Sequence, residues 1–407
     1  MKIWAVWLAI LGVAIAGATA QISELMDPTR PKDPREFFET RMRQAHVPGL
    51  AVAILHGGEV AWADGFGRVD AGTDRPVTAE TLFHVASVSK TITGTAVMQL
   101  VERGLVDLDG PVDEYLPFSV RNPRLPDEPI TIRQLMAHTS SLRDHDETYM
   151  GQYTLDAGGG DSPLALASFV EGYVSPGGTW YDAEANFADE PPGTSHDYSN
   201  VGFALLGVLV EAVSGIDFAD YCRENVFEPL GMVETGFRIA EVDESLLAHP
   251  HEYKDGTFTV LPHYSYATYP DGSLRTSVAE YALFLQAMMN GGPGANGSRI
   301  LEEATVAEMI RTQFPELNSH QGLAWDTKQI GNLDPERCAR GPVPGHTGGD
   351  PGVFSIIFYV PDERSGAILF ANGLPDLKIA PVLSLIASVR RLVLELDAEP
   401  NREEDVE

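Results

Sequence analysis

Residues 84–94 read HVASVSKTITG, and this stretch decides how the rest of the chain is interpreted. It places Ser87 three residues before Lys90, at the start of the apolar pattern SKTITGTAVMQLVERG, which predicts a helix ending at Gly104. Residues three apart lie on one face of a helix, so the hydroxyl and the amine would point the same way. The stretch therefore predicts a serine nucleophile with an amine beside it.

The chemistry of such a site needs lysine and not arginine. A serine hydroxyl is a weak nucleophile without an adjacent base. A lysine can be that base when desolvation or a nearby charge lowers its pKa, whereas arginine keeps its proton in proteins. The chain has 6 lysines and 22 arginines, so an incidental cation would more often be arginine. The S-x-x-K pattern is weak by itself, because a helix-start serine with an incidental lysine looks the same.

A second motif, HDYSN, contains Tyr198 and Asn200 just before a strongly apolar helix pattern at 201–215. A tyrosinate held near a lysine can take the serine proton and pass it to a leaving group. An asparagine amide can hold the lysine or a substrate carbonyl. Alone, the motif fits a buried tyrosine and an N-capping asparagine better than a catalytic pair.

A third motif, GHTGGDPGVFSIIFYV, places glycines beside a strand pattern, where they let a ligand approach the backbone closely. A free N–H group at this strand edge, together with the N–H of Ser87, would form an oxyanion hole. The alternative is a glycine-rich turn that leads into a hairpin. Each of the three motifs occurs once, and their order along the chain is more specific than any one of them.

With this order of motifs the chain resembles the penicillin-recognising serine hydrolases. These are the class C β-lactamases, D-alanyl-D-alanine peptidases, D-aminopeptidases and family-eight carboxylesterases. The resemblance extends from roughly residue 35 to residue 395 and includes GFGRVD, TLFHVASVSKTITG, LMAHTSSL, YSNVGFALLG and GHTGGDPGVFS. It implies an active site between a sheet domain and a helical subdomain, with no metal and no organic cofactor.

The resemblance also implies a role for each matching residue. Ser87 would be the acylated nucleophile, Lys90 its proton-handling partner and Tyr198 the general base and acid. Asn200 would orient the lysine and the substrate. The remaining site residues are His346, Thr347, Gly348 and Gly349. His346 and Thr347 would line the polar end of the substrate. The backbone N–H groups of Ser87 and Gly349 would build the oxyanion hole.

One departure affects what the resemblance implies. β-Lactamases of this group usually carry lysine where His346 stands, and histidine is a weaker, pH-dependent cation. Binding of a substrate carboxylate is therefore less expected here, and an H-T-G motif is similar to that of some peptidases and esterase-like members. The chain also lacks G-x-S-x-G, which argues against the α/β-hydrolase fold.

The expected fold is α/β (α+β) of the β-lactamase/transpeptidase type, an antiparallel sheet flanked by helices plus an all-helical subdomain. Strand patterns with turn residues predict hairpins at 49–70 and 352–373, and helix patterns appear at 34–45, 163–173 and 380–396. The predicted division is a sheet domain of residues 34–115 and 240–395, a helical subdomain of residues 116–239, and an acidic disordered tail at 396–407. Within the subdomain, the long acidic loop 143–194 would cover the cleft.

Charge and termini limit the partners and the compartment. The 407 residues carry a formal charge of −31, which disfavours nucleic acids and anionic membranes as partners. Residues 1–20 combine a lysine, an apolar run and a small-x-small ending, so we expect a signal peptide cleaved before Gln21 and a secreted or periplasmic protein, with no stable membrane insertion. A retained anchor helix is the alternative.

The cysteine and histidine residues outside these motifs predict no metal centre. Cys222 and Cys338 could form one disulfide or stay as two buried thiols. His145, His249 and His251 lack the spacing of metal ligands and are interpreted as surface or loop residues.

The sequence therefore predicts a secreted serine hydrolase that cleaves a small ester, peptide or other amide through an acyl-serine. One alternative is a β-lactamase or a slowly deacylating penicillin-binding sensor, and another is an acyltransferase that uses an alcohol or amine in place of water. The substrate class and the oligomeric state stay open, because one fold supports several such chemistries.

Overall fold

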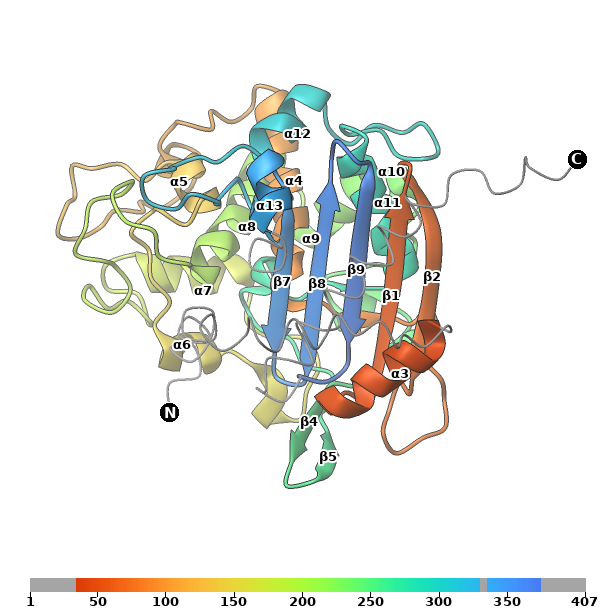
Figure 1. Ribbon diagram of the computed structural model, residues 1–407. Helices are drawn as coiled ribbons and strands as arrows, with labels where there is room; N and C mark the ends of the chain where they lie inside the picture. Colours follow the sequence, from red (N-terminus) through yellow and green to blue (C-terminus); the bar gives the residue numbers. More distant parts are fainter. Residues whose placement is uncertain (1–33, 330–334, 375–407) are drawn as a thin grey trace, which may run out of the picture.

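Both ends of the described chain build one five-stranded antiparallel sheet (Figure 1). The computed structural model describes residues 34–329 and 335–374. The strand order is β2-β1-β9-β8-β7, with bounds β1 Gly49–His56, β2 Glu59–Gly67, β7 Gly345–Asp350, β8 Val353–Val360 and β9 Ser365–Ala371. Strand β1 pairs with β9, Leu50 opposite Ala371. The predicted hairpins are confirmed: β1 pairs with β2, and β8 pairs with β9.

The β1–β2 turn shows why this part of the sequence folds as a hairpin. Gly57 and Gly58 have φ angles of 62° and 89°, the backbone that a two-residue hairpin turn of the primed type requires. Only glycine adopts such angles without steric cost. His56 and Glu59 face each other directly across the turn.

The central strands β1, β8 and β9 are buried on both faces, which gives the fold three layers. Helix α3 (Pro34–Ala45) covers one face, and Figure 1 shows it in front of the sheet with α4, α9 and α11 behind. Alternate residues of β1 separate into the two cores accordingly. Leu50 and Val52 pack with Phe38 of α3, whereas Ala51 and Leu55 belong to the larger core on the helical side.

Most helices lie behind the sheet, and the larger core runs without a break from the sheet into them. Their bounds are α4 Ser89–Glu102, α5 Ile132–Met136, α6 Asp146–Met150, α7 Leu166–Val174, α8 Asn200–Ser214, α9 Phe218–Cys222, α10 Glu228–Leu230, α11 Val278–Met289, α12 Glu303–Met309 and α13 Pro335–Arg340. Helix α8 begins after a Ser199 cap, whose side chain accepts a hydrogen bond from the Gly202 N–H, and ends at Gly215 with φ 72°.

Shorter elements complete the described chain. The 3-10 turns are η1 Ala86–Val88, η2 Val112–Glu114, η3 Thr154–Ala157, η5 Ile239–Glu241, η6 Glu244–Leu246 and η7 Tyr269–Asp271, and η4 Arg223–Phe227 is a π-helical turn. Two small antiparallel pairs are β3 Phe83–His84 with β6 Arg275–Thr276, and β4 His251–Lys254 with β5 Thr257–Val260.

Several expectations about segments outside the sheet can be compared with the structure. The helix expected at 163–173 is α7, and the rest of 143–194 holds only α6 and η3 as regular elements. The interpretation of His251 as a surface or loop residue is wrong: it starts β4, is 1% exposed, and its ring nitrogens bond Ala71 N–H and the Asn372 carbonyl. Cys222 and Cys338 are both buried free thiols.

Other expectations stay predictions. The signal peptide, the helix at 380–396 and the acidic tail lie outside the described residues. The division into 34–115, 116–239 and 240–395 stays a prediction. Within the described residues no single helix is long and apolar enough to cross a membrane, although α8 and the segment Phe218–Leu230 pass that test together as a pair bent by 79°.

Candidate active site

The turn that carries Ser87 is strained and firmly tied down. Ser87 lies in η1, and the preceding Ala86 has a φ of 47°, which is unusual for a residue with a Cβ atom. The Ser89 hydroxyl donates to the Ala86 carbonyl at 2.6 Å and accepts from the Leu274 N–H at 3.0 Å. These bonds fix the turn between η1 and the neighbouring β6 segment, so the direction of Ser87 is set by the backbone.

Lys90 follows in the first turn of α4 and is completely buried. Its Nζ lies 3.1 Å from Ser87 Oγ, 2.6 Å from Asn200 Oδ1 and 2.7 Å from the Asp271 carbonyl oxygen. An ammonium fills all three positions with its three hydrogens. A neutral amine keeps two hydrogens for the two shorter contacts and turns its lone pair to Ser87. The contact between Lys90 Nζ and Ser87 Oγ, the longest of the three, is therefore the one along which a proton can move.

Tyr198 faces the same amine. Lys90 Nζ lies 4.9 Å from the centre of its ring. Burial raises the pKa of Tyr198, while the charge of Lys90 and hydrogen bonding with Lys90 and Ser87 partly offset this effect. At neutral pH the phenol is therefore a proton carrier that starts in its neutral form.

His138 supports Tyr198 from behind. The two rings are stacked at 4.2 Å with an angle of 30° between them. His138 Nδ1 accepts a hydrogen bond from the Ser199 N–H, and burial lowers the pKa of the imidazole well below its usual value. His138 is thus a neutral, buried ring that packs against the ring of Tyr198.

Asp144 holds Asn200 in place and caps α8. Its carboxyl oxygens accept bonds from the Asn200 N–H and side-chain amide, both at 2.8 Å, from the Val201 N–H at 3.0 Å and from the Ser199 hydroxyl at 3.1 Å. The amide of Asn200 donates to Asp144, so its oxygen is directed to Lys90. A carboxylate at this helix N-terminus also interacts favourably with the helix dipole.

Strand β7 brings the H-T-G residues to the Ser87 turn. It is the last strand in the sheet order, and the backbone at Gly348 lies against η1. A Cβ atom on Gly348 would lie 2.4 Å from the Val85 carbonyl oxygen and 3.0 Å from the Ser87 nitrogen. Glycine is therefore required at this position for the strand to approach the nucleophile.

The other β7 residues differ in environment. Burial and the positive charge of Lys90 lower the pKa of His346 to about 4, so the imidazole is uncharged at neutral pH. The side chain of Thr347 is exposed, and Gly349 pairs with Phe354 of β8. His346, Gly348 and Gly349 thus lie on the strand nearest to Ser87, but no hydrogen bond joins the His346 or Thr347 side chain to Ser87 within the described residues.

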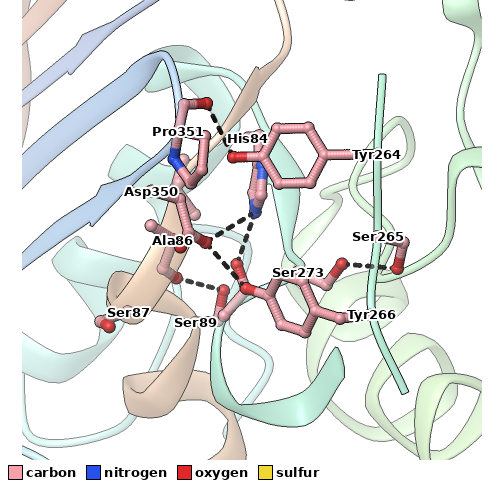
Figure 2. A network of polar contacts seen from close by, with 12 residues as sticks. His84, Ala86, Ser87, Ser89, Tyr264, Ser265, Tyr266, Ser273, Asp350 and Pro351 are labelled. Atoms are coloured by element: carbon pink, nitrogen blue, oxygen red, sulfur yellow. Dashed lines mark hydrogen bonds and ion pairs between the residues drawn. The ribbon is translucent and has the colours of Figure 1, made fainter. Parts of the chain in front are cut away.

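A polar network lies beside the Ser87 turn (Figure 2). Asp350, directly after Gly349, accepts bonds from Tyr153 OH at 2.7 Å and Tyr266 OH at 2.9 Å. His84 Nε2 lies 3.6 Å from the same carboxyl and 2.9 Å from the Gly272 carbonyl. Figure 2 shows Ser87 at the margin of this network, on the side away from the tyrosine rings. The network ties β7 to the segment 264–273.

The structure brings together Ser87, Lys90, Tyr198 and Asn200 as the motif order predicts, and it adds residues that the sequence reasoning missed. His138 and Asp144 belong to the quoted segment LMAHTSSL and the residues just after it, but nothing in their local pattern reveals their contact with residues 198–201. Asp271 and Asp350 were also missed. Among the described residues no cluster of histidine, cysteine and acidic side chains could hold a metal ion.

Comparisons with known proteins identify related sequences and related folds. A family model described as Beta-lactamase matches residues 34–386. Penicillin-binding protein 4 of Amycolatopsis lactamdurans is 29% identical over 353 residues, which cover 83% of this chain and 84% of that protein. Esterase EstB of Burkholderia gladioli is 31% identical over 242 residues, 55% of this chain and 57% of the esterase. The structure of the D-amino acid amidase from Ochrobactrum anthropi superposes with a TM-score of 0.69 at 21% identity, over 90% of this chain and 98% of that one.

The close approach of β7 to the nucleophile can be tested with Gly348→Ala. The added methyl group would push the strand away from Val85 and Ser87, so we expect kcat/KM on an ester substrate to fall by about 10²–10³, as when an oxyanion donor is lost. Unfolding stability should fall by only about 1–3 kcal/mol. Gly341→Ala is the control, because its Cβ atom would meet only Arg337 Nη1 at 3.8 Å. Equal activity of the two variants would contradict the prediction.

Proposed function

The chain belongs to the β-lactamase family, whose model matches residues 34–386, and on this basis we propose that it hydrolyses an ester or amide bond through an acyl intermediate on Ser87. The observation that carries the proposal is the 3.1 Å contact between Lys90 Nζ and Ser87 Oγ, in a setting where the amine has two other fixed acceptors. A serine in such contact with a buried amine is an activated nucleophile.

The proposed reaction has two halves. In the first, the Ser87 proton moves to Lys90 as Oγ bonds to the substrate carbonyl carbon, and the N–H groups of Ser87 and Gly349 stabilise the oxyanion. Tyr198 then gives a proton to the leaving oxygen or nitrogen as that bond breaks. In the second half, water attacks the acyl carbon and its proton passes to the Tyr198 phenolate, while Lys90 returns its proton to Ser87 Oγ as the acid product is released.

The charge of the site favours neutral esters and amides over substrates that carry a carboxylate. His346 stands at the position expected to face the polar end of the substrate, and with a pKa of about 4 it carries no charge at neutral pH. The chain as a whole has a net charge of −31, which repels anions. The similarity to an esterase supports the same substrate class, and the similarity to a penicillin-binding protein supports slow deacylation of a β-lactam as the second candidate.

We also propose that the protein is exported, because residues 1–20 have the pattern of a cleaved signal peptide. N-terminal sequencing of protein recovered from the medium or periplasm should begin at Gln21. A chain that keeps residues 1–20 and stays inside the cell would contradict export.

The nucleophile is tested by Ser87→Ala. Hydrolysis of p-nitrophenyl esters should fall by at least about 10³, because the acyl intermediate can no longer form. Intact-mass measurement of the wild-type protein with an activated ester should show a transient acyl adduct, and the variant should show none. A lasting adduct with penicillin would favour the second candidate. Undiminished hydrolysis by the variant would refute the assignment of Ser87.

The role of His346 is tested by His346→Lys. A permanent cation should raise kcat/KM for a carboxylate-bearing β-lactam, relative to a neutral ester, by about tenfold, the value of one charge-assisted hydrogen bond. His346→Gln controls for loss of the ring and should leave the ratio unchanged. In the wild-type protein the ratio should rise only as the pH falls toward 4, where the imidazole gains its proton. If lysine leaves the ratio unchanged, His346 does not face the carboxylate.

A further inference from the structure

Asp271 is a buried acid next to Lys90 that the proposed reaction does not use. It ends η7, its side chain is 1% exposed, and its carbonyl oxygen accepts the 2.7 Å bond from Lys90 Nζ. One carboxyl oxygen, Oδ1, accepts a 2.9 Å bond from the Tyr149 hydroxyl of α6. The other, Oδ2, is buried and makes no hydrogen bond of normal geometry within the described residues. A fully ionised carboxylate would pay a high desolvation cost in this position.

The backbone of Asp271 is held beside the amine, because η7 is fixed to α4. The Thr93 hydroxyl of α4 donates to the Pro270 carbonyl at 2.6 Å, one residue before Asp271. Pro270 also packs closely on Gly207 of α8, where an added Cβ atom would lie 2.5 Å from its ring. The position of the Asp271 backbone next to Lys90 is therefore set by the fold.

The groups around Asp271 make Lys90 its dominant ionic neighbour. Its pKa is raised to about 8, chiefly by burial, and the positive charge of Lys90 and the Thr268 hydroxyl offset part of that effect. The other titratable groups that act on it are acids or phenols: Asp144 before α6, Asp350 of β7, Tyr149 of α6, Tyr198 before α8, and Tyr153 and Tyr266 beside β7.

We propose that Asp271 is a positioning residue that controls the charge state of Lys90, leaving the amine free to take the Ser87 proton while the acid is neutral and holding it as an ammonium when the acid is ionised. This inference rests on the proposed function of Lys90. An opposite charge nearby favours the charged form of an amine, so ionisation of Asp271 lowers the fraction of Lys90 that can act as a base. Asp271 thereby places an upper pH limit on activity.

The direction in which kcat/KM changes with pH follows from the ionisation of Asp271. Below pH 8 the Asp271 carboxyl is mostly protonated and uncharged, and the proposed reaction proceeds. Above pH 8 it ionises, and kcat/KM should decline as the neutral fraction declines. One pH unit above this pKa, about one tenth of the acid stays neutral, so ionisation of Asp271 reduces kcat/KM about tenfold at pH 9.

The experiment compares pH profiles of kcat/KM for a neutral ester in wild type and Asp271→Asn. The amide is similar in shape to the neutral acid, can still accept from Tyr149, and cannot ionise. We expect near wild-type kcat/KM at pH 7 and an alkaline decline displaced to higher pH, so that the ratio of variant to wild type rises about tenfold between pH 7 and pH 9. KM should change less than kcat, because the carboxyl does not touch substrate.

Two further variants keep the test decisive. Tyr149→Phe removes a donor that favours the ionised acid, so the alkaline decline should move to higher pH but persist; this arm holds even if Asp271→Asn folds poorly. Asp350→Asn alters the other buried acid, whose pKa is raised to about 6, and should leave the decline near pH 8 in place.

The outcomes separate this inference from the proposed function. If Ser87→Ala abolishes hydrolysis but Asp271→Asn and Tyr149→Phe keep the wild-type alkaline decline, the inference fails and the function stands. A decline that disappears in Asp350→Asn and persists in Asp271→Asn also overturns it. If Ser87→Ala hydrolyses normally, the proposed function fails and this inference fails with it.

Discussion

The burial of one amine is the constraint on which the rest of the site depends. Lys90 has no contact with solvent, and an amine in that position needs a polar partner for each of its hydrogens. Its partners come from three separate parts of the chain: η1, the start of α8 and the end of η7. These three segments must dock correctly before the amine can be buried without a large penalty, so formation of the core and assembly of the site are one event.

The elements around this amine are held by groups that do no chemistry themselves. Asp144 fixes the amide of Asn200, His138 fixes the ring of Tyr198, and Ser89 fixes the strained turn at Ala86. Preorganisation of this kind lowers the cost of reaching the reactive geometry, because the reorganisation is completed during folding. The strain at Ala86 is maintained because bonds from two sides determine its conformation.

The sequence predicts much of the fold, since the signals are local. Gly57-Gly58 marks a hairpin, Gly215 ends a helix, and the order of three short motifs indicates the family. The supporting residues could not be predicted, because their contacts are not local in the sequence. Asp144 meets Asn200, and Asp271 meets Lys90, across long stretches of chain, and an aspartate in a loop looks the same whether it is solvated or buried. His251 was misjudged in the same way, because the partners that bury it are Ala71 and Asn372, from distant parts of the chain.

The pairing of β1 with β9 has a consequence for how the chain is made. Leu50 and its neighbours emerge from the ribosome well before their partners around Ala371. Non-local pairing of this kind is slow, whereas the intervening helices can form from contacts closer in sequence. Until β9 is made, β1 is paired only with β2. The other edge of β1 is then open to association with further chains. A molecular chaperone that shields residues 49–67 until β9 has been synthesised would increase the yield of folded protein.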